Sequence, residues 1–173
     1  IGGVLGAFAV IFFVCVAFVM SDKVYSAKEL KYRFKLKILG TLPMPGVKKA
    51  GKIDGWLNRL EGRACDKDEE REFGLIAANI CNYAEGAETL LVVGCAGKPL
   101  IGQVGEKLTG RLPGLKVISG GNLLTDAESL RKLPECDGVL LVEQCGMSLY
   151  SAVELEMEKA RDLGKSVVGC VVF

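Results

Sequence analysis

The chain has 173 residues, 25% of them charged and 50% apolar, and its 22 Lys and Arg nearly balance 21 Asp and Glu. This length predicts one modest domain. The positive charge is confined to residues 21–52, which carry a net +7 against −6 over residues 53–173, so a uniformly basic nucleic-acid binder is excluded. Histidine is absent, which excludes His-assisted triads and His-ligated metals.

Residues 1–20 predict a transmembrane helix. Seventeen of these residues are apolar and the other three are Gly. A helix of this length spans roughly 30 Å, the thickness of the bilayer's hydrocarbon core. Because Ile1 already lies inside the apolar run, we expect the chain to be part of a longer protein with a missing N-terminal region.

The basic segment after the apolar run predicts the topology. Positive charge is retained on the cytoplasmic side, so residues 21–173 are expected to be cytoplasmic. The seven cysteines form no CxxC pair and no metal-ligand spacing, and most of them are expected to be small buried side chains in a reducing compartment.

The middle of the chain predicts a linker followed by helices. Residues 43–55 hold two Pro, three Gly and three Lys, a composition typical of a linker. Trp56, Leu57 and Leu60 form a short apolar stripe that suggests a docking helix. A longer helix is expected over 73–86, where apolar residues recur at helical spacing before Gly86.

From Glu88 onward the pattern alternates strand and helix. Strands are expected over 89–94, 115–119, 138–143 and 165–173. Helices are expected between them, two of which begin at apparent capping boxes, Thr125 to Glu128 and Ser151 to Glu154. The fold class is therefore α/β, a small three-layer parallel-sheet domain of the reduced P-loop or Rossmann-like kind.

These elements divide the chain into four parts. They are a transmembrane helix over 1–20, a basic juxtamembrane segment and linker over 21–55, a helical lead-in over 56–86, and the α/β domain over 87–173.

The turn after the first of these strands is where such a fold binds phosphate. Here Gly94, Gly97, Lys98 and Pro99 form a degenerate loop, GxxGK followed by Pro instead of GxxxxGK[ST]. Pro99 replaces the hydroxyl that would bind magnesium and removes a backbone donor. We therefore expect an ordinary Gly-rich turn, with no bound cofactor and no metal.

No other group of residues forms a catalytic constellation. Glu143 ends a strand, where a catalytic carboxylate is plausible, but without a partner it is expected to be a solvated loop residue. Glu154, Glu156 and Glu158 are expected to form a charged helix face. Ser148 and Tyr150 have no adjacent base. No catalytic residue is predicted.

Several stretches resemble bacterial polysaccharide chain-length determinants, or polysaccharide co-polymerases, and the tyrosine-kinase domain that accompanies them. The apolar run, the basic segment and Leu39-Gly40-Thr41-Leu42-Pro43 look like the second membrane helix of those proteins and the stretch after it. Phe73, Asn79 and Ile80 match the first helix of the kinase domain, but Gly74 and Ala77 stand at its two arginine positions.

The resemblance extends to the end of the chain. Residues 89–99 fall where the kinase has its first strand and P-loop, and residues 137–172 are similar to its last βαβ unit. The kinase's second acidic strand motif, magnesium-binding Asp strand and C-terminal tyrosine cluster are missing.

The resemblance implies a membrane-anchored regulatory or scaffold subunit of exopolysaccharide or capsule biosynthesis, with a pseudokinase-like cytoplasmic domain and no enzyme activity of its own. Homo-oligomers would form through the membrane and extracytoplasmic parts. The polysaccharide polymerase or export machinery and a separate tyrosine kinase would be partners. The alternative is a tyrosine kinase or ATPase whose nucleotide site is completed by a partner chain. A third interpretation is a membrane-tethered Rossmann-like sensor of an anion.

Overall fold

The structure, a computed structural model, describes residues 2–45 and 69–173. In chain order the elements are α1 (Gly2–Val19), α2 (Ala27–Phe34), β1 (Ile38–Thr41), α4 (Glu69–Tyr83), β2 (Thr89–Val93), α5 (Lys98–Thr109), β3 (Lys116–Ser119), α6 (Ala127–Lys132) with a 3-10 turn (Leu133–Glu135), β4 (Gly138–Glu143), α7 (Tyr150–Asp162) and β5 (Ser166–Val172).

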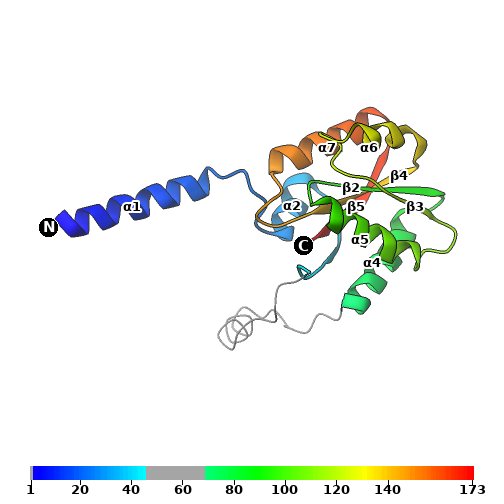
Figure 1. The fold of residues 1–173 in the computed structure, drawn as a ribbon, viewed down its shortest axis with the longest axis horizontal. Coiled ribbons are helices and arrows are strands. Elements are labelled where there is room, and N and C mark those ends of the chain that lie inside the picture. Colours follow the sequence, from blue (N-terminus) through cyan, green and yellow to red (C-terminus); the bar gives the residue numbers. More distant parts are fainter. Residues whose placement is uncertain (1, 46–68) are drawn as a thin grey trace.

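A five-stranded parallel sheet forms the middle layer, in the order β1-β5-β4-β2-β3 (Figure 1). Alternate side chains of its strands enter two apolar cores. Leu90 and Val92 pack with α4 and α5 on one face, whereas Leu91 and Val93 pack with α2 and α7 on the other. The predicted three-layer α/β class is confirmed.

The structure contains a fifth strand in the segment that the sequence assigned to a juxtamembrane stretch and linker. β1 pairs with β5. Leu39 within β1 and Leu42 just after it are buried. Val24 and Leu30 are also fully buried, because α2 and the residues before it pack against α7. Residues 21–42 therefore belong to the α/β fold, and the expected boundary at residue 87 is wrong.

α4 begins earlier than expected, at Glu69, and the Asn79 side-chain amide donates to the Leu39 carbonyl at 3.1 Å. The two stretches that carried the family resemblance, 39–43 and 72–80, are therefore in direct contact. The expected Trp56 helix, Cys65 and the linker beyond residue 45 lie outside the described residues.

Both predicted capping boxes differ from the structure. Asp126, not Thr125, caps α6 by accepting from the Glu128 amide. Ser151 lies inside α7, where its amide donates to the Asp22 carboxylate at 2.9 Å. A residue distant in the sequence supplies that acceptor, so no local pattern could show it.

α1 extends away from the domain in Figure 1, and Phe8, Phe13 and Val19 on it are 71%, 70% and 79% exposed. No helix among residues 2–45 and 69–173 meets the length and apolarity required to cross a membrane. The predicted transmembrane helix is therefore not supported by the structure.

Candidate functional site

The order in which successive strands are added to the sheet reverses at β2, which makes the gap between β2 and β4 a topological switch point. The chain passes from β2 outward to β3, then returns to β4 on the other side of β2. In open parallel sheets, ligands bind at the carboxyl ends of the strands at such a point. The degenerate loop after β2 and Glu143 at the end of β4 both lie at this position.

The loop after β2 is closed by internal hydrogen bonds. The amides of Gly94, Cys95 and Ala96 donate to the Gly121 carbonyl at 3.5 Å, to the Glu143 carboxylate at 3.4 Å and to the Val142 carbonyl at 3.1 Å. A P-loop instead directs such amides toward phosphate. Gly94 has φ +151°, and a Cβ there would lie 2.1 Å from the Val142 oxygen, so the tight approach to β4 requires glycine.

The other three residues of the predicted loop lie at the start of α5, where Gly97 is the N-cap. Lys98 is largely exposed, and its Nζ lies 3.4 Å from Asp126 Oδ2. A hydrogen bond from the Ser129 hydroxyl, aided by Lys98, holds the pKa of Asp126 below its usual value. Pro99 occupies the first turn of α5, where its lack of a backbone N–H removes one possible donor to phosphate.

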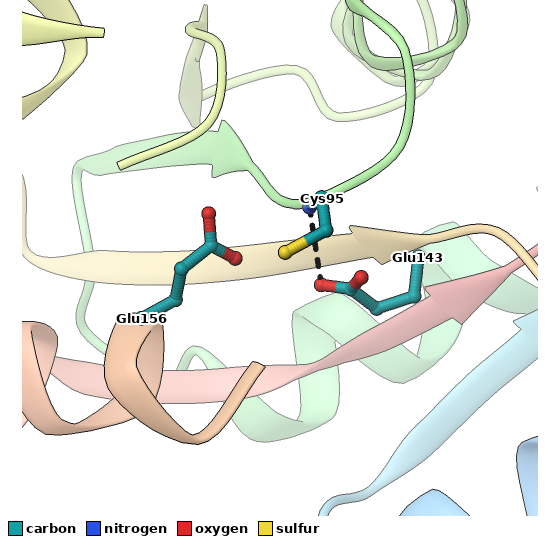
Figure 2. A group of neighbouring side chains, drawn as sticks. All are labelled: Cys95, Glu143 and Glu156. Atoms are coloured by element: carbon teal, nitrogen blue, oxygen red, sulfur yellow. Dashed lines mark hydrogen bonds between the residues drawn. The ribbon is translucent and has the colours of Figure 1, made fainter. Parts of the chain in front are cut away.

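A cluster of three titratable side chains lies between the sheet and α7. Their candidate ligand atoms, the Cys95 sulfur and one carboxylate oxygen each from Glu143 and Glu156, lie within 4.8 Å of one another. Figure 2 shows the sulfur between the two carboxyl groups. The β2–α5 loop supplies the thiol, β4 supplies Glu143 and α7 supplies Glu156.

Both carboxylates are fully buried, so the expectation that they are solvated is wrong. Glu143 Oε1 accepts from the Cys95 amide, and Glu156 Oε1 accepts from the Leu123 amide at 3.0 Å. The second oxygen of each carboxylate is buried without a hydrogen-bond partner. Buried polar atoms of this kind are rare and costly, so the cluster requires a physical explanation.

The electrostatics of the cluster disfavour three negative charges. Burial raises the pKa of Glu143, and the neighbouring Glu156 raises it further. Burial also raises the pKa of Glu156, partly offset by the Leu123 amide. The pKa of the Cys95 thiol is raised by burial and by both carboxylates. Each group therefore favours its protonated form unless a cation lies among them.

The sequence did not predict this cluster. Its three residues are 48 and 13 positions apart, and only the positions of Cys95 and Glu143 at the ends of adjacent strands could have indicated a meeting point. Among the other described cysteines, Cys136 and Cys170 are buried as expected, whereas Cys15, Cys81 and Cys145 are exposed. The Ser148 hydroxyl, which was expected to have no base nearby, is buried and accepts from the Gln144 amide at 2.9 Å.

No family model and no curated protein matches the chain. Among solved structures, the chimerical protein CapA2B2 is similar with a TM-score of 0.50 and 11% identity, over 85% of this chain and 98% of that one. The BceF tyrosine kinase domain is similar with a TM-score of 0.46 and 11% identity, over 87% and 98%. The likeness to CapA2B2 shows that the two chains share a fold.

Proposed function

We propose that the chain is a membrane-attached regulatory or scaffold subunit of exopolysaccharide or capsule biosynthesis that helps to set polymer length. Its α/β domain is kinase-like but does not transfer phosphate. The polysaccharide role rests on the resemblance of residues 39–43 and 72–80 to chain-length determinants, and the likeness to CapA2B2 supports the fold on which that resemblance depends.

One observation carries the non-catalytic part of the proposal, the internal hydrogen bonding of the loop after β2. Phosphoryl transfer needs loop amides, a Lys and a metal held by a Ser or Thr hydroxyl and a strand-end Asp. Three amides of this loop already have protein acceptors, one of which is a side-chain oxygen of Glu143, so these amides are not free to bind phosphate. Pro99 stands where the metal-binding hydroxyl would be.

The proposal includes a location and an assembly. The apolar N-terminal segment attaches the chain to the bacterial cell membrane, with residues 21–173 on the cytoplasmic side. Homo-oligomers form through the membrane and extracytoplasmic parts, because Ala77 is buried against the sheet and Gly74 offers no side chain for an inter-subunit ion pair. The polysaccharide polymerase or export machinery, and a separate tyrosine kinase, are the proposed partners.

Calorimetric titration of the full chain in detergent with Mg-ATP tests the non-catalytic assignment, with Lys98→Ala as the matched control. We expect no micromolar binding to either protein. A functional tyrosine kinase domain titrated in the same buffer shows that the assay detects binding.

Micromolar binding to the wild type that disappears in Lys98→Ala would contradict the proposal. It would favour the second candidate function, a kinase or ATPase completed by a partner chain. The exposure of Lys98 at the start of α5 is the observation that keeps this candidate open.

A further inference from the structure

We infer that Cys95, Glu143 and Glu156 form a binding site for one zinc ion that joins the β2–α5 loop, β4 and α7. This site is separate from any nucleotide function. The three candidate ligand atoms lie within 4.8 Å of one another, so small side-chain movements would bring all of them to one ion.

The unpartnered carboxylate oxygens are the observation that favours a cation. Glu143 Oε2 and Glu156 Oε2 are both buried and lack a hydrogen-bond partner. In each residue Oε1 is anchored by a backbone amide, which leaves Oε2 available as a ligand. No salt bridge to either carboxylate occurs among the described residues, and the nearby Lys98 pairs with Asp126 instead. A divalent cation held between the two carboxylates would offset two buried negative charges.

The donor set favours zinc among the common divalent ions. A thiolate is a soft ligand that magnesium and calcium avoid, whereas carboxylates are hard ligands. Zinc accepts both, with Zn–S near 2.3 Å and Zn–O about 2.0–2.2 Å. Three protein ligands leave one position of a tetrahedral ion for water.

A zinc ion at this site would hold together the elements at the topological switch point, between β2 and β4. Its ligands come from three elements, one of which is the loop where a P-loop protein holds phosphate. A zinc ion here would stabilise the closed loop, because it binds the folded chain and the unfolded chain does not hold the three ligands together.

The test uses the full chain in detergent, stripped of metal by a chelator. Thermal unfolding is measured with and without Zn²⁺, and zinc stoichiometry is measured after gel filtration. We expect one zinc per chain and an increase of about 100-fold in the ratio of folded to unfolded protein at a free zinc concentration of 100 Kd.

Cobalt supplies a readout of thiolate ligation that stability does not. Co²⁺ bound in place of zinc should give a sulfur-to-cobalt charge-transfer band in the near ultraviolet. The band should be absent in Cys95→Ser and unchanged in Cys81→Ser, whose thiol is exposed and outside the cluster.

The variants Glu143→Gln and Glu156→Gln separate metal binding from folding. Each keeps the side-chain oxygen that accepts from a backbone amide and, like a protonated carboxyl group, carries no charge, so the metal-free variants should be about as stable as the metal-free wild type. Both should lose the zinc-induced stabilisation.

A wild type that gains no stability from zinc would overturn the inference and would indicate a buried pair of protonated carboxyl groups. A cobalt band that persists in Cys95→Ser, or zinc stabilisation that persists in both Gln variants, would also overturn it, because either result places the metal elsewhere on the chain.

Discussion

Gly169 determines how closely β1 approaches β5. A Cβ at this position would lie 2.6 Å from Leu39 Cγ and 2.6 Å from the Lys37 carbonyl oxygen. The Cys170 amide donates to that same carbonyl at 2.8 Å, so the backbone cannot move away without losing a hydrogen bond. The absence of a side chain at Gly169 therefore allows the edge strand to dock.

Gly169→Ala is expected to destabilise the protein by about 1–3 kcal/mol, because the added methyl group overpacks this contact. Urea unfolding of the full chain measures the change. Gly102→Ala in α5 is the matched control, since a Cβ there meets nothing within 4 Å and Ala favours a helix. Equal unfolding midpoints for the two variants would show that β1 does not pack against Gly169.

Asp137 links the starts of β2 and β4 and should make stability depend on pH. Its carboxylate accepts from the Thr89 hydroxyl at 2.8 Å and from the Thr89 and Glu88 amides at 2.9 Å each. These bonds, the Thr89 hydroxyl foremost, hold the pKa of Asp137 below its ordinary value of 3.8. The stabilisation is therefore complete above that value and is lost as pH falls through the lower pKa of the folded state.

Asp137→Asn should flatten the acid limb of the stability curve, because an amide keeps an acceptor oxygen but does not titrate. Urea midpoints measured between about pH 5 and pH 2 should fall more steeply in the wild type than in the variant. Parallel acid limbs would show that the three hydrogen bonds do not distinguish the ionised from the protonated carboxyl group.

Burial of single polar residues was the feature that the sequence could least predict. Glu143 follows five strand residues, and Glu156 lies between two other glutamates, so both patterns are typical of solvated positions. Glu143 is buried beneath the β2–α5 loop, whose Cys95 amide donates to it, and Glu156 because α7 presents it to the loop at Leu123. These are tertiary contacts, which a pattern along one segment does not contain.

At the scale of elements, four strands could be predicted because each is a continuous or nearly continuous apolar run between turn residues. β1 could not, because its four residues lie in a basic segment and its pairing depends on β5, more than 120 residues later. The sequence predicted a capping box at Ser151, whereas α7 already begins at Tyr150. The reason is similar, since the distant Asp22 supplies the acceptor for the Ser151 amide.

Residues 21–42 are therefore expected to be necessary for folding of the α/β unit. Apolar side chains of this stretch that are buried include Val24, Leu30, Leu36, Leu39 and Leu42. Each contributes about 1.5–3 kcal/mol on burial, so together they approach the entire stability of a domain, about 5–15 kcal/mol. A chain of residues 46–173 should show no cooperative unfolding transition.

The matched control is a chain of residues 21–173, which removes α1 but keeps all five strands and should unfold cooperatively in urea. Circular dichroism follows both transitions. If the two chains unfold at the same urea concentration, β1 and α2 are not needed for folding of the α/β unit.

At the scale of the whole molecule, charge is divided along the chain in a way that predicts its orientation. α1 exposes its apolar side chains, and the segment that follows carries a net +7 over residues 21–52. Basic segments are retained on the cytoplasmic side of a membrane and are attracted to the anionic lipids of that leaflet. With the N-terminal segment attached to the membrane as proposed, the α/β unit after it should therefore be on the cytoplasmic side.

Cys81 reports this orientation, because it is exposed on α4, far along the chain from α1. In intact bacterial cells, a membrane-impermeant maleimide should leave Cys81 unlabelled, and after permeabilisation the same reagent should label it. Mass spectrometry of the peptide that contains Cys81 distinguishes this thiol from the others, and Cys81→Ser provides the background. Labelling of Cys81 in intact cells would place the α/β unit outside the membrane. The proposed cytoplasmic partners would then be impossible, whereas the zinc site, which depends only on contacts within the domain, would be unaffected.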